Sequence, residues 1–114
     1  MQFSVQRIDQ TVVFMLEGKL LNEQQTAIIR DRIGEELVSQ RKKFILDLKG
    51  IEFVNSACLN FLVAAKNKID EQGGRVILCN ASDQLRRLLS VTRLDSFFKI
   101  AGRTNDALGM LNEK

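Results

Sequence analysis

Two short, unbroken apolar runs, alternating with stretches of helical periodicity, constrain the fold of this chain most strongly. The first run lies in KFILDLKG at residues 43–50, and the second is RVILC at residues 75–79. Runs of this length without polar alternation are typical of strands that are covered on both faces. Between them, apolar residues recur at helical spacing: Cys58, Leu62, Ala65 and Ile69. A strand, a helix and a strand in this order imply a right-handed crossover, so we expect an α/β fold with a mostly parallel sheet.

The N-terminal third of the chain predicts a hairpin and a helix. Residues 3–8 and 12–16 read as two strands joined by a turn at Asp9 and Gln10, with the first strand at the sheet edge. A helix follows over residues 23–40, with Asn22 as its cap and Gln25 as a weak capping-box partner. The hairpin adds an antiparallel edge to the parallel sheet.

The C-terminal part predicts two further helices. Gly73 and Gly74 stop the helix that precedes the strand at 75–79. Ser82 can cap a third helix, residues 96–100 read as a last short strand, and Thr104 can cap a final helix. The expected element order is ββαβαβαβα, with about four helices.

Length, charge and hydropathy narrow the function class. We expect 114 residues to form one domain over residues 1–114, with one core. The net charge is +3, but cations and acids are interspersed and the chain has no Tyr or Trp, so we expect no nucleic-acid platform. The N-terminal sequence lacks the apolar stretch of a signal peptide, and no run is long and apolar enough for membrane insertion. We therefore expect a cytoplasmic protein.

The sequence lacks the residue patterns of common enzyme active sites. Without any histidine, a serine or cysteine nucleophile lacks its commonest base, and no phosphate-binding loop follows a strand. The two cysteines, Cys58 and Cys79, do not have the spacing of a zinc or CxxC site. We therefore expect no catalytic residue, metal or cofactor. One alternative is that Cys58 is a redox-active thiol in the first turn of a helix; otherwise it is a small hydrophobe in the core.

The junction FVNSACLNF, at residues 53–61, places polar side chains where a helix begins. The hydroxyl of Ser56 or the amide oxygen of Asn55 can cap this helix, which is the ordinary structural reading. The functional reading is that Ser56 is exposed and is phosphorylated. The helix N-terminus would stabilise the phosphate, so the added charge would act on whatever docks over the junction.

Several short motifs follow one another at defined spacings along the chain: LEGKLL at 16–21, Asp47 with Leu48 and Gly50, the loop at 55–58, the Gly73-Gly74 pair and QLRRLLSVTRLDSFF at 84–98. In these features the sequence from Phe44 to Ile100, together with the early segment at 16–21, resembles a STAS domain of the bacterial anti-sigma factor antagonist type. The resemblance implies a STAS fold with the element order predicted above.

The resemblance also implies a function and a site. In the family, the unphosphorylated antagonist binds a partner that is both anti-sigma factor and GHKL-type serine kinase, which releases a sigma factor; phosphorylation blocks binding, and a serine phosphatase resets the cycle. The acceptor position is Ser56. Asn55 stands where the family has Asp, Ala57 is within the usual variation, and Cys58 stands where Gly is usual. We expect a partner-binding surface at Asn55, Ser56, Ala57, Cys58 and Phe61.

A second reading keeps the fold and changes the role. STAS domains also act as non-phosphorylated partner subunits or scaffolds of transport and signalling complexes. Phe61 bears on this reading, because it lies off the apolar stripe of its helix and is expected to be partly exposed, either as an interface anchor or packed against a neighbouring loop.

Overall fold

In the part of the chain that the structure describes, five strands form one mixed sheet, and their order in the sheet follows their order in the sequence. The computed structural model describes residues 2–18, 23–51 and 56–112. β1 and β2 pair antiparallel, and the other three strand pairs are parallel, which confirms the expected hairpin and parallel sheet. The strands are β1 Gln2–Ile8, β2 Thr11–Gly18, β3 Lys43–Ile51, β4 Arg75–Cys79 and β5 Lys99–Ala101, in the order β1-β2-β3-β4-β5.

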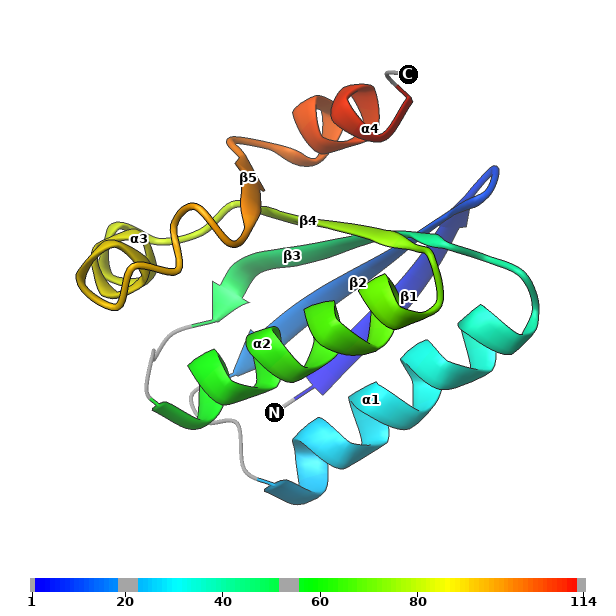
Figure 1. Cartoon of the computed structure of the whole chain (residues 1–114), viewed down its shortest axis with the longest axis horizontal. Helices are drawn as coiled ribbons and strands as arrows, with labels where there is room; N and C mark the ends of the chain where they lie inside the picture. The colour runs from blue at the N-terminus through cyan, green and yellow to red at the C-terminus, as the bar shows by residue number, and fades with distance from the viewer. Residues whose placement is uncertain (1, 19–22, 52–55, 113–114) are drawn as a thin grey trace.

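The four helices among the described residues cover the sheet unequally. They are α1 Glu23–Val38, α2 Ser56–Glu71, α3 Asp83–Val91 and α4 Thr104–Asn112. α1 and α2 lie side by side along one face of the sheet, α3 lies beyond its edge, and α4 covers part of the other face (Figure 1). None of the described helices combines the length and the apolar character that a membrane span requires. The order ββαβαβαβα is the one expected from the sequence.

The sheet separates two apolar clusters, and β3 contributes to both. Phe44 packs into the cluster that α1, α2 and α3 complete, whereas the next residue, Ile45, packs into the cluster beneath α4. Both side chains are fully buried, because successive residues of a strand point to opposite faces. The structure thus confirms that the unbroken apolar run marks a central strand covered on both faces.

Several predicted boundaries differ from the structure; β2, for example, spans Thr11–Gly18 instead of residues 12–16. β3 extends to Ile51, beyond the segment at residues 43–50 that contains the apolar run, because pairing with β2 resumes after a register shift, at Glu17–Gly50 and Gly18–Ile51. β5 begins at Lys99 instead of residue 96, because the amides of Phe97 and Phe98 bond back to the Leu94 carbonyl in a turn. α1 ends at Val38 rather than at residue 40.

The predicted helix ends are confirmed in part. The Ser82 hydroxyl accepts a hydrogen bond of 3.1 Å from the Leu85 amide, as expected of a cap. Gly73 has φ +77° after the last turn of α2, which is the left-handed backbone expected there. Thr104 is the first residue of α4, and its hydroxyl lies 3.6 Å from the Cys79 sulfur. The predicted cap at Asn22 lies outside the described residues.

A buried carboxylate fastens the edge strand β1 to α1. The side chain of Glu36, only 2% exposed, forms ion pairs with Arg7 of β1, Arg32 of the preceding turn and Arg41 beyond the helix. Burial alone would raise the pKa of Glu36, but the hydrogen bond from Arg7 and the three positive charges lower it below its ordinary value. The cluster therefore contributes to stability as long as Glu36 is ionised.

Glu36→Gln is expected to lower the free energy of unfolding by about 1–3 kcal/mol, because it leaves three guanidinium groups around a neutral amide. The matched control is Glu35→Gln, since Glu35 is exposed on the same helix. In wild type this contribution is complete above the unfolded-state pKa of about 4.3 and is lost as the pH falls through the lower folded-state pKa. Urea titrations at pH 7 and pH 3 measure both effects, and equal losses for the two variants at pH 7 would contradict the assignment.

Candidate functional site

The predicted phosphoacceptor is the first residue of α2 and is exposed. Ser56 follows residues 52–55, which lie outside the described residues and include the predicted partner-binding residue Asn55. Beyond Ser56, α2 is anchored firmly, because Leu62, Ala65 and Ile69 are completely buried against the sheet. The hydroxyl-bearing residue thus sits at the accessible end of a rigid helix.

The start of α2 is well suited to hold a negative charge. The first turn of a helix carries backbone N–H groups without intrahelical acceptors and the positive end of the helix dipole. No Asp or Glu occupies the first turn of α2, so none of its own side chains already neutralises this end. A phosphate on Ser56 would therefore be stabilised at this position.

Two predicted partner-binding residues point into the core instead of toward solvent. Cys58 is 1% exposed and Phe61 is 3% exposed. The expectation that Phe61 is partly exposed is wrong: α1 packs beside α2 and covers the flank that holds its ring. Of the predicted partner-binding residues in the part of the chain that the structure describes, Ser56 is exposed and Ala57 is half-buried. The side chain of Cys58, in a position where glycine is usual, adds volume to the core and not to the surface.

Burial also decides the chemistry of the Cys58 thiol. Desolvation raises its pKa to about 11, whereas a redox-active thiol at a helix N-terminus needs a lowered pKa. The redox alternative is therefore disfavoured, and Cys58 behaves as a small core hydrophobe.

Cys58 is expected to react slowly with a thiol reagent in the native protein, because about one thiol in a thousand is ionised at pH 8 when the pKa is near 11. Ellman's reagent and the variant Cys79→Ala, which leaves Cys58 as the single cysteine, measure this rate. Denaturant should accelerate labelling many-fold. The raised pKa also implies that stability declines as the pH rises from about 8.5, the unfolded-state value, toward the folded-state value. Native labelling as fast as that of a small thiol would restore the redox reading.

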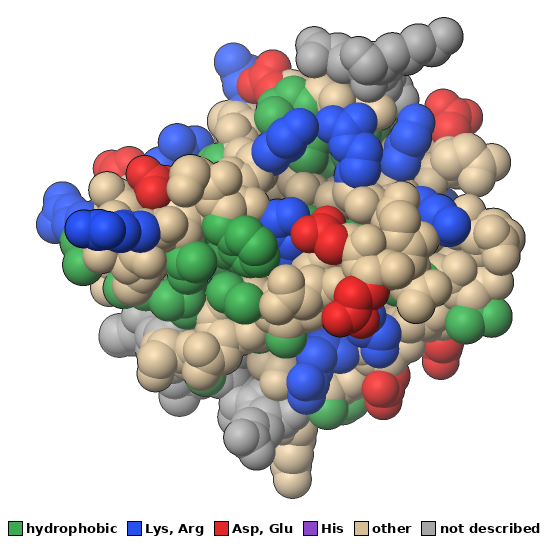
Figure 2. Space-filling model, in the orientation of Figure 1, with side chains coloured by type: hydrophobic (Ala, Val, Ile, Leu, Met, Phe, Trp, Pro, Cys, Tyr) green, Lys and Arg blue, Asp and Glu red, His purple; other side chains and the backbone are tan. Residues whose placement is uncertain are grey.

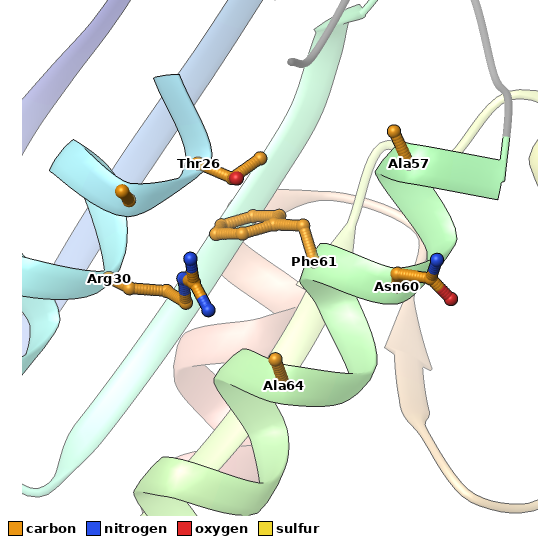
Figure 3. A pocket seen from close by; sticks show the side chains of 7 residues that line it. Thr26, Arg30, Ala57, Asn60, Phe61 and Ala64 are labelled. Atoms are coloured by element: carbon orange, nitrogen blue, oxygen red, sulfur yellow. The ribbon is translucent and has the colours of Figure 1, made fainter. Parts of the chain in front are cut away.

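An open groove of about 540 Å³ runs between α1 and α2, and its lining includes Ala57, the residue after Ser56. Figure 3 shows the Phe61 ring between the two helices, with the Arg30 side chain reaching in from α1 and Asn60 at the α2 rim. Small side chains keep the groove open: Ala27, Ala57 and Ala64. The sequence analysis did not identify Thr26, Arg30 and Asn60 as residues of a groove. The sequence signal for the groove is the pair of alanines at 57 and 64, because residues seven apart lie on the same face of a helix.

Two residues of β3, Asp47 and Gly50, hold the end of this strand against its neighbours. Asp47 accepts hydrogen bonds from the Lys49 amide at 3.0 Å and from Asn80 Nδ2 at 2.9 Å, which links β3 to the end of β4. A Cβ at Gly50 would lie 2.7 Å from the Leu16 carbonyl oxygen, so only glycine permits the close approach of β2 and β3. Asp47 and Gly50 therefore have structural roles: they hold β3, the strand that precedes α2, against its neighbours.

Comparison with known proteins points to one family. Residues 2–107 match the family model described as the STAS domain. A candidate anti-sigma factor antagonist of Thermotoga maritima is 26% identical over 109 residues, which cover 95% of this chain and 96% of that protein. The crystal structure of a candidate anti-sigma factor antagonist of the same organism is 25% identical, covers 97% of this chain and 95% of that one, and superposes with a TM-score of 0.84. The Bacillus cell fate determinant SpoIIAA in its phosphorylated form shares the fold, with a TM-score of 0.76 at 20% identity over 97% of this chain and all of that one.

Proposed function

Because this chain belongs to the STAS domain family, we propose that it is an anti-sigma factor antagonist controlled by phosphorylation of Ser56. In this proposal the unphosphorylated protein binds an anti-sigma factor that is also a GHKL-type serine kinase, and thereby releases a sigma factor. Phosphorylation by the same partner ends the interaction, and a serine phosphatase restores it. The protein acts in the cytoplasm as a regulator and not as an enzyme.

The exposure of Ser56 at the first position of α2 is the observation that carries the proposal. A kinase needs an accessible hydroxyl, and the site provides one at a helix N-terminus, whose positive dipole end favours the phosphorylated product. The curated relative with 26% identity over nearly the whole chain supports the same role. A protein of the same fold has also been solved in a phosphorylated form.

The geometry favours a switch that acts on docking and not on folding. Phosphorylation adds about −1.5 to −2 charges at neutral pH, and the helix N-terminus stabilises them, so α2 should persist. A partner that covers the phosphate without a matched cation incurs a desolvation and repulsion cost of several kcal/mol. Since about 1.4 kcal/mol is tenfold in affinity, this cost is enough to end a micromolar contact.

The departure at Cys58 does not interfere with this mechanism. Cys58 is turned into the core, and Ala57, which is within the usual family variation, is small and half-buried, so neither adds bulk over Ser56. Asn55 keeps the shape of the usual Asp without its charge, so we propose that the partner kinase does not require that carboxylate.

Phosphorylation by purified kinase tests the proposal directly. Each GHKL-type anti-sigma kinase of the source organism is incubated with the chain and ATP, and the product is mapped by mass spectrometry. We expect one phosphate on Ser56 and none on the Ser56→Ala variant. A phosphate on another residue, or on none with every kinase, would contradict the proposed switch.

A further inference from the structure

Half-buried apolar side chains gather on the surface between α2 and α3. This α2–α3 patch consists of Leu59, Val63, Leu94 and Phe97, which pack against the core while part of each stays exposed. Figure 2 shows hydrophobic side chains collected in the same region. Lys66 Nζ lies 4.8 Å from the centroid of the Phe97 ring, so the turn after α3 is held against α2. Contiguous exposed apolar surface of this kind marks interaction sites.

The patch begins at the phosphoacceptor. Leu59 and Val63 follow Ser56 by three and seven residues, and residues with these separations share one face of a helix. A partner that covers the patch therefore extends over the start of α2, where a phosphate would meet it.

The α3 side of the patch is rich in unpaired positive charge. Between Ser82 and Lys99 the chain carries four cations and two carboxylates. Arg86, Arg87 and Arg93 are exposed, and none of them forms an ion pair with a carboxylate in the part of the chain that the structure describes. Lys and Arg side chains lie over α3 beside the patch in Figure 2. The helix also ends on Val91, which is 76% exposed.

We propose that the α2–α3 patch and the arginines of α3 are the docking surface for the anti-sigma factor, which meets them with an apolar surface rimmed by acidic side chains. This inference rests on the proposed function and adds the chemistry of the partner. Exposed arginines favour an acidic partner and accelerate its association. The same acidic rim explains the direction of the switch, because a phosphate on Ser56 would be repelled by it.

The two exposed valines at helix ends provide a matched test. Val91 ends α3 beside the proposed surface, and Val38 ends α1 with 81% exposure. We expect Val91→Glu to weaken binding of the purified anti-sigma kinase by about fivefold or more, through lost apolar contact and added repulsion. Val38→Glu should change the affinity by less than about twofold, since it makes the same change outside the surface.

A second pair of variants tests the charge. Arg87→Glu should weaken binding by about fivefold or more at low ionic strength, and its affinity should depend less on salt than that of wild type. Arg103→Glu is the control, because Arg103 is exposed before α4, the helix on the other face of the sheet. Its affinity and salt dependence should match those of wild type.

The outcomes separate this inference from the proposed function. If no anti-sigma kinase of the source organism binds the wild-type chain, the proposed function is wrong, and the docking-surface inference, which rests on it, is wrong too. If a kinase binds wild type and discriminates against Ser56→Glu, but Val91→Glu and Arg87→Glu bind as their controls do, only the docking surface is wrong. Equal losses in the test and control variants would also reject the surface.

Discussion

Ser56→Glu is expected to weaken binding to the anti-sigma kinase by at least about tenfold, measured by calorimetry. The carboxylate imitates part of the phosphate charge at the exposed start of α2. Its own cost in stability should be small, because an acidic residue in the first turn interacts favourably with the helix dipole. Ser56→Ala should bind as tightly as unphosphorylated wild type and should stay bound when kinase and ATP are both present.

Ser39→Glu provides the control for this substitution. Ser39 is exposed just after α1, so the change in charge is the same, and the C-terminal end of α1 lies at the opposite end of the helix pair from the start of α2 (Figure 1). Its affinity should stay within about twofold of wild type. Equal affinity for wild type and Ser56→Glu would rule out the phosphorylation switch and favour a STAS partner subunit or scaffold that works without phosphorylation.

Phe14→Ala is expected to lower the free energy of unfolding by about 3–5 kcal/mol. Phe14 is fully buried on β2, between Phe3 of β1 at a ring distance of 6.1 Å and Phe44 of β3 at 6.3 Å. Removing the central ring opens a cavity and ends both aromatic contacts. Chemical denaturation followed by circular dichroism measures the loss.

Phe3→Ala distinguishes the central ring from its neighbour. Phe3 is only partly buried at the sheet edge, so its removal ends one aromatic contact and leaves a site that water can fill. We expect a loss of about 1–2 kcal/mol. Equal losses of unfolding free energy for the two variants would show that Phe14 does not contribute more to packing than Phe3.

The sequence predicted those features that depend on neighbours along the chain. The apolar run at Phe44 and Ile45 indicated a strand covered on both faces, and the cap at Ser82 indicated a helix start. Both are confirmed. Ser56 was likewise predicted at the first turn of a helix, and it is the first residue of α2.

The exposure of Phe61 could not be predicted in this way. On an isolated helix this residue lies off the apolar stripe and faces solvent. In the structure α1 lies alongside and buries it, while Arg30 from α1 helps to form the groove next to the ring. Which flank of α2 is covered depends on the packing of a helix that lies about 30 residues earlier in the chain.

The sequence by itself determined the order of the elements, the central strands and the place of Ser56, because hydrophobic periodicity and caps act within a few residues. Only the tertiary structure decided where β3 ends, which arginines surround Glu36 and which apolar side chains form the α2–α3 patch. These features depend on contacts between distant segments. The free energy of such contacts depends on burial and on pairing across elements, which a local pattern does not specify.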